Sequence, residues 1–116
     1  MKIFGVSQSS GVERRLNIER GIEGVVLTLT DHLGGKEHGR IIVRGDAFAA
    51  ALMEPAVGGS TTEGISKSAG EQTLLDIEVR RNEVLLVIRS HSGERGDVAV
   101  GLDDLQDALE GVINPG

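Results

Sequence analysis

An internal repeat constrains the fold of this chain more than any other feature of its sequence. Residues 64–78, GISKSAGEQTLLDIE, repeat residues 5–19, GVSQSSGVERRLNIE, with seven of fifteen positions identical at a constant offset of 59. The similarity continues in order: residues 25–29 match 84–88 and, after a two-residue insertion, residues 39–52 match 96–109. We interpret the chain as a tandem duplication with a first repeat at 1–55, a linker at 56–62 and a second repeat at 63–116, together forming one structural domain.

Each repeat contains four predicted strands and one predicted helix. Gly, Ser and Asn mark the turns, and residues 14–20 and 73–81 alternate apolar and polar side chains as half-buried strands do. We expect strands at residues 2–7, 14–20, 25–30 and 40–44, and again at 64–68, 73–81, 84–90 and 97–101. A helix closes each repeat, at 46–53 with Asp46 as its N-cap and at 103–113 with Asp103 as its N-cap.

The connections between these strands are too short for parallel crossovers, so the sheets should be antiparallel. The strands at 25–30 and 84–90 are apolar on both faces, which is typical of a strand in the middle of a covered sheet. A unit of about sixty residues buries little surface alone, so the two units should share one core. The predicted fold class is α+β: tandem duplicated β-β-β-β-α units with antiparallel sheets and one helix per repeat, related by a pseudo-twofold axis.

Composition excludes several kinds of site. The 116 residues include no Cys, Tyr or Trp, and the only aromatic residues are Phe4 and Phe48. A disulfide framework, a thiolate zinc site and a Cys nucleophile are therefore excluded, and the lack of Cys fits a cytoplasmic location. No apolar run is long enough for a signal peptide or a membrane span, so no membrane partner is expected. The net charge of −6, supplied entirely by residues 59–116, argues against a protein whose main role is to bind phosphate backbones.

The histidines are candidate metal ligands. His32 and His38 lie in one predicted loop with Asp31 and Glu37, and such residues can bind a divalent cation. Their spacing is loose for a metal site, and His91 matches His32 in the second repeat, so equivalent surface hairpins are the preferred interpretation. We expect no metal and no cofactor.

Three short motifs have both a functional and a structural interpretation. The Ser/Gly-rich turns at 7–11 and 66–70 could cradle an anion, but Ser and Gly are also ordinary turn residues, which is the preferred interpretation. The sequence Gly34-Gly35-Lys36 lacks the Ser or Thr and the helix that a P-loop needs, and the tripeptide Arg44-Gly45-Asp46 is explained by a helix cap. No Ser lies in a nucleophile-elbow context, so we assign no catalytic residue and do not expect an enzyme.

The arginines are the strongest functional signal in the sequence. Several of them flank the predicted strands of both repeats, and we predict that they form a binding surface: Arg14, Arg15, Arg20, Arg80, Arg81 and Arg89. If the helices cover one face of the sheet, the carboxylates of the last helix leave a more basic strand surface. Alternatively, the arginines pair with Glu19, Glu78 and Glu83 across strands, and both interpretations stay open.

The order of elements resembles a known group of folds. Residues 74–109, LLDIEVRRNEVLLVIRSHSGERGDVAVGLDDLQDAL, run through strand, turn, strand, Gly-rich loop, short strand and helix, and residues 16–52 repeat this order. The pattern resembles the Whirly-type nucleic-acid-binding folds, including PUR repeats and the eukaryotic transcriptional positive-cofactor family. The resemblance implies binding of single-stranded DNA or RNA on the strand face.

Two functions follow from these observations. The first is a small non-enzymatic protein, regulatory or nucleic-acid-binding, that uses the arginine-bearing strand face. The alternative is an acidic protein-interaction or assembly module, either a homo-oligomer or an accessory to a phage or bacterial complex, as acidity and few aromatic residues favour. In either case we expect a homo-oligomer.

Overall fold

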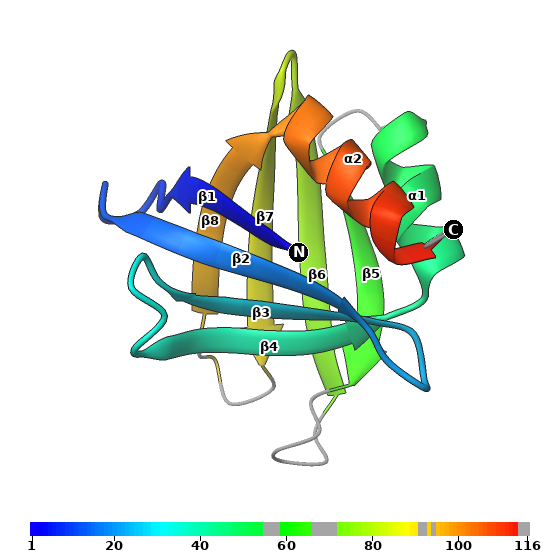
Figure 1. Ribbon diagram of the computed structural model, residues 1–116, viewed down its shortest axis with the longest axis horizontal. Coiled ribbons are helices and arrows are strands. Elements are labelled where there is room, and N and C mark those ends of the chain that lie inside the picture. Colours follow the sequence, from blue (N-terminus) through cyan, green and yellow to red (C-terminus); the bar gives the residue numbers. More distant parts are fainter. Residues whose placement is uncertain (55–58, 66–71, 91–92, 94, 114–116) are drawn as a thin grey trace.

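Eight strands and two helices make up the fold (Figure 1). The computed structural model describes residues 1–54, 59–65, 72–90, 93 and 95–113. The elements, in chain order, are β1 (Lys2–Val6), β2 (Glu13–Arg20), β3 (Val25–Asp31), β4 (Glu37–Val43), α1 (Gly45–Met53), β5 (Ser60–Ile65), β6 (Gln72–Arg80), β7 (Glu83–Ser90), β8 (Arg95–Gly101) and α2 (Leu102–Ile113).

The strands follow one another around a single closed barrel, in the order β1 to β8. Each strand pairs antiparallel with the next, as the short connections predicted. Two of the strand pairings, which we call seams, are narrow: each is registered at one residue pair. The register joins β4 to β5 at Ile42 and Ile65, and it joins β1 to β8 at Val6 and Ala99.

The predicted fold class is therefore wrong. The chain does not form tandem β-β-β-β-α units with one helix per repeat; it forms one mostly antiparallel sheet that closes on itself, accompanied by two helices. The two seams explain the difference physically. A four-stranded sheet leaves two edges with unpaired backbone groups, and pairing β4 with β5 and β1 with β8 removes those edges.

The inside of the barrel is filled by the apolar positions of the alternating strands. On β2, for example, Leu16 and Ile18 point inward and are almost fully buried, whereas Asn17 between them faces outward. The barrel core continues into the helices through Phe48 and Leu52 of α1 and four residues of α2: Leu105, Ala108, Leu109 and Val112. One core thus joins both halves of the chain.

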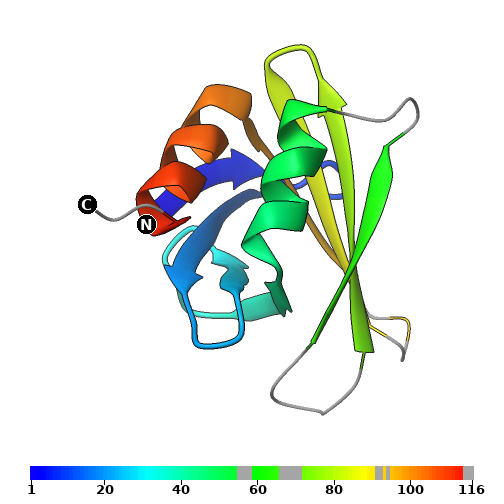
Figure 2. The same ribbon diagram turned by 90° about the vertical axis from the view of Figure 1, so that its right-hand side faces the viewer.

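The two helices lie side by side against the barrel, as both views show (Figures 1 and 2). α2 packs on β1, β2 and β8, so it covers the β1–β8 seam, and α1 packs beside β5. They approach closely at Gly45, where a Cβ atom would lie 3.2 Å from Cδ1 of Ile113, a tight contact that the Ile113 side chain would have to relieve by a small shift. No helix in the described part of the chain is long and apolar enough to cross a membrane.

The predicted helix caps are also wrong. α1 begins at Gly45, with Arg44 at the N-cap position and no side-chain cap, so Asp46 lies in the first turn. α2 begins at Leu102, whose N–H donates to the Asn82 carbonyl (2.7 Å), and Asp103 lies in its first turn. Both carboxylates still stand at the positive end of a helix dipole.

The predicted linker and the fifth strand differ from the structure in position. β5 begins at Ser60, inside the predicted linker at 56–62, because the strand pairs with β6 from there on. Residues 56–58 of that linker and residues 66–68 of the predicted strand at 64–68 lie outside the described residues.

Candidate functional site

The six predicted arginines are distributed over both halves of the barrel. Arg14, Arg15 and Arg20 belong to β2. Arg80 ends β6, Arg81 forms the turn that follows, and Arg89 lies near the end of β7, with β7 separated from β2 by the barrel interior. Each arginine therefore has its own surroundings.

The arginines of β6 and β7 have acidic partners. Arg80 donates to Glu78 on its own strand (2.8 Å), and this hydrogen bond lowers the pKa of Glu78. Arg89 pairs with Asp76 on the neighbouring strand (Nε to Oδ2, 2.6 Å). Arg81 stands at the two-residue turn with a positive φ of 52°, a backbone conformation unusual for a side chain of its size. Arg80 and Arg89 thus pair with carboxylates, as the alternative interpretation of the arginines predicted for this group.

Arg14 belongs to a buried polar cluster around Asp97 of β8. Its Nη1 donates to the backbone carbonyl of Asp97 (2.8 Å) and lies 3.3 Å from Oδ1 of the carboxylate. The same carboxylate accepts the hydroxyls of Ser7 (2.9 Å) and Ser9 (2.7 Å) and the N–H groups of Gln8 (2.8 Å) and Ser9 (3.1 Å). The Ser-rich turn at 7–11 is therefore an anion cradle, and its anion is a side chain of the same protein.

The surroundings of Asp97 also determine the pKa of its carboxylate. Burial of the carboxylate raises its pKa, but the hydrogen bonds from Ser9, Ser7 and two backbone N–H groups together lower it below the ordinary value of 3.8. Asp97 is therefore ionised at neutral pH although the residue is only 8% exposed. The cluster anchors the loop after β1 to β8, next to the narrow seam between those strands. Its role is structural.

The strand register shows which side chains are neighbours on the outer surface of β1–β4. One cross-strand row runs across all four strands and contains no carboxylate: Lys2, Asn17, Thr28 and Arg40. The adjacent row consists of Phe4, Arg15, Thr30 and Glu37. The two rows contain three cations and one carboxylate, Glu37, which is bonded to Arg40 (2.9 Å), so their net charge is positive in a protein of charge −6. We call these eight residues the β1–β4 outer face.

Phe4 and Arg15 are the unusual members of this face. Phe4 is 64% exposed, whereas the other aromatic residue, Phe48, is fully buried. Arg15 stands directly opposite Phe4, and its guanidinium lies against Gly34, where a Cβ atom would collide with it. Its Nε is buried without a hydrogen-bond partner, and no described residue forms an ion pair with it. An aromatic ring and an unneutralised cation are thus adjacent on an open surface.

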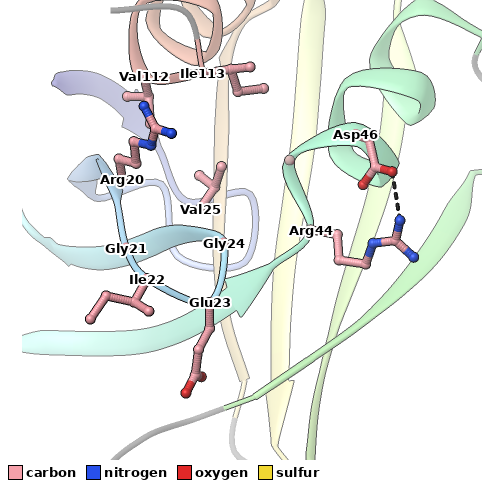
Figure 3. Close-up of a pocket in the computed structure, with 11 residues that line it drawn as sticks. Arg20, Gly21, Ile22, Glu23, Gly24, Val25, Arg44, Asp46, Val112 and Ile113 are labelled. Atoms are coloured by element: carbon pink, nitrogen blue, oxygen red, sulfur yellow. Dashed lines mark hydrogen bonds and ion pairs between the residues drawn. The ribbon is translucent and has the colours of Figure 1, made fainter.

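Arg20 lines a hollow of about 350 Å³ between the β2–β3 turn, the start of α1 and the end of α2 (Figure 3). Arg44 lies across the hollow from it but is bonded to Asp46 (2.7 Å), and Glu23 adds a second carboxylate. The two positive and two negative groups cancel. This hollow therefore does not favour an anionic ligand, and Arg20 lies away from the β1–β4 outer face.

The candidate metal ligands stand around the β3–β4 turn. The Asp31 carboxylate accepts the N–H groups of Gly35 (2.7 Å) and Lys36 (3.1 Å), which lower its pKa and close the turn. Burial, and then the charges of Arg14 and Lys36, lower the pKa of His38, so this imidazole is neutral at pH 7. Among the described residues, no group of three or more His, Asp or Glu could hold a metal ion. His91 and the turn at 66–70 lie outside the described residues.

Comparison with protein-family models, curated proteins and solved structures finds no match to this chain. The resemblance to Whirly-type folds and the prediction of a homo-oligomer therefore stay predictions.

Sequence reasoning selected only one residue of the β1–β4 outer face, Arg15. It missed the others because they are far apart in the chain and of ordinary types: Lys2, Phe4, Asn17, Thr28, Thr30, Glu37 and Arg40. The signal that could have found them was strand alternation combined with hairpin register, since cross-strand neighbours follow from the two together.

Proposed function

We propose that this protein is a small non-enzymatic, cytoplasmic protein that binds single-stranded nucleic acid on the β1–β4 outer face. The observation that carries the proposal is the exposed ring of Phe4 opposite Arg15, beside a cross-strand row without carboxylates. Proteins that bind single strands combine stacking on aromatic side chains with cations that follow the phosphates. The β1–β4 outer face offers both.

Each part of the face has a role in this proposal. Phe4 stacks on one base, and Lys2, Arg15 and Arg40 contact phosphates. The side chains of Asn17, Thr28 and Thr30 lie between the cations. The Asn17 amide already donates to Glu19 (2.6 Å) and the Thr30 hydroxyl to the Asp31 carbonyl (3.0 Å), so these two side chains offer acceptors, and Thr28 offers a hydroxyl, to base edges or sugars. The guanidinium of Arg15, which forms no ion pair with any described residue, keeps its full positive charge for a phosphate.

The test is the binding of labelled single-stranded DNA and RNA of about 12 nucleotides, measured by fluorescence anisotropy from about 50 mM salt upward. Phe4→Ala should remove one stacked base, about 1–3 kcal/mol, which weakens binding by about 5- to 150-fold. Arg15→Gln should reduce the slope of log affinity against log salt by about 0.7, the value for one phosphate contact on a single strand.

Two control variants separate this function from others. Phe4→Leu keeps an apolar side chain without an aromatic face, so it should lose nearly as much nucleic-acid affinity as Phe4→Ala. Arg80→Gln, on the opposite side of the barrel and already paired with Glu78, should bind normally. Absence of binding at the lowest salt, or an equal loss for Arg80→Gln and Arg15→Gln, would contradict the proposal.

A further inference from the structure

An open apolar groove runs between α1 and α2, on a part of the molecule separate from the β1–β4 outer face. It has a volume of about 400 Å³, and its apolar lining includes Ala49, Leu52 and Met53 of α1 and Leu109 and Ile113 of α2. The α2 lining extends from Gln106 to Ile113, about 10 Å at the α-helical rise of 1.5 Å per residue. Met53 is 77% exposed at its border. The groove is long enough to contact two turns of another helix.

The helices that form the groove, together with Glu54 directly after α1, hold a charge equal to the whole net charge of the protein. Residues 45–54 and 102–113 contain six carboxylates and no Lys, Arg or His, while the rest of the chain sums to zero. Glu110 lines the groove, and Glu54 directly follows Met53. Asp103 lies one turn before Gln106 and Asp107 one turn before Glu110, so both are near the same stripe of α2. The groove therefore has an apolar floor and an acidic border.

We propose that the α1–α2 groove binds a cationic amphipathic helix of a partner protein. An amphipathic helix places its apolar face in a hydrophobic groove of this kind, with anchors at helical spacing. Its Lys and Arg residues would then face the carboxylates at the border, which steers association and excludes acidic partners. The flexible thioether of Met53 can adapt to the anchor side chains.

A second copy of this chain is a poorer occupant on electrostatic grounds. Joining two copies through this groove would bring twelve carboxylates together with no basic residue from any of the four helices. A cationic partner instead neutralises the same surface. The groove proposal is independent of nucleic-acid binding, because none of the residues lining the groove belongs to β1–β4.

The probe is a labelled peptide of about 16 residues, built from Leu and Lys with Leu at alternating third and fourth positions. It is titrated with the whole 116-residue chain, and binding is followed by anisotropy. We expect binding that weakens with salt. Met53→Ser should weaken it on the order of five- to tenfold through lost apolar contact. Glu110→Gln should weaken it and reduce its dependence on salt. The matched controls are Leu33→Ser, an equally exposed apolar residue on the β3–β4 turn, and Glu19→Gln on β2; both should bind normally.

Three results would overturn the proposal. The first is equal binding of a scrambled peptide with the same composition, which would show attraction by charge alone. The second is unchanged peptide binding by Met53→Ser. The third is a concentration-dependent dimer in sedimentation that Met53→Ser abolishes, which would make a second copy the occupant. Phe4→Ala should leave peptide binding unchanged, so failure of the nucleic-acid proposal and failure of this one are distinguishable.

Discussion

Asp97→Ala should be among the most destabilising single substitutions in this protein. The carboxylate accepts hydrogen bonds from two hydroxyls and two backbone N–H groups and lies beside the Arg14 guanidinium, at 2.7–3.3 Å. Alanine leaves these groups without their acceptor, and Ser7 is fully buried, so water cannot replace the carboxylate there. Removing one partner of a buried ion pair costs about 3–5 kcal/mol, and we expect about 4 kcal/mol here.

A graded series isolates the cause of this loss. Asp97→Asn keeps one oxygen for the N–H groups of Gln8 and Ser9 but loses the charge opposite Arg14, so we expect about 2 kcal/mol. Ser7→Ala removes one hydrogen bond to the carboxylate and should also cost about 2 kcal/mol. Asp76→Asn breaks the more exposed pair with Arg89 and should cost below about 1 kcal/mol.

The assay is urea unfolding followed by far-ultraviolet circular dichroism, because the chain has no Trp or Tyr for fluorescence. A loss of about 4 kcal/mol corresponds to a fall in Tm of roughly 15–20 °C for a domain of this size. A loss for Asp97→Ala below about 1 kcal/mol, as for Asp76→Asn, would refute the reasoning that the cradle holds the β1–β8 seam.

Two further predictions concern the same seam. The pKa of Asp97 is lower in the folded protein than its ordinary value of 3.8, so the stabilisation by its carboxylate is fully present above that value and is lost as the pH falls through the folded pKa. The difference in unfolding free energy between the natural protein and Asp97→Asn should therefore be constant from neutral pH to about pH 5 and shrink in more acidic solution. A difference that grows there would contradict the assignment. Gly5→Ala should destabilise the protein by about 3 kcal/mol, because the new Cβ atom would collide with the Ala99 carbonyl oxygen. Gly11 has a positive φ of 74° but open space around it, so Gly11→Ala should cost only about 1 kcal/mol in the same urea assay. Equal losses for the two variants would argue against close packing of β1 on β8.

The positions of the individual elements were largely predictable. The prediction of a strand at 14–20 matches β2 because Leu16 and Ile18 alternate with polar residues, and that period depends only on the neighbours in the chain. The helix at 103–113 was recognisable from the spacing of Leu105, Leu109 and Val112 for the same reason. The cap predicted at Asp103 lies two residues after the N-cap position, because α2 already begins at Leu102, and helix ends depend on contacts such as the hydrogen bond of Leu102 to Asn82.

The candidate site was much less predictable than the elements. Arg14, Arg15 and Arg20 look alike in the sequence, yet Arg14 contacts Asp97, Arg20 faces the hollow beside α2 and Arg15 has no acidic partner among the residues that the structure describes. An arginine has the same charge and reach wherever it stands. Its role depends on which residues of other strands lie beside it.

By itself, the sequence determined the strands, the helices, the apolar interior and the antiparallel hairpins, because each of these depends on periodicity and turn residues within short segments of chain. Only the tertiary structure decided that the strands close into one barrel, since β1 meets β8 through pairing of Val6 with a residue far along the chain, Ala99. The same closure brings the Ser7 turn onto Asp97. The hydrogen bond from Ser7 to Asp97 joins residues 90 positions apart, and the Val6–Ala99 pair is more distant still; no local pattern encodes such a pairing.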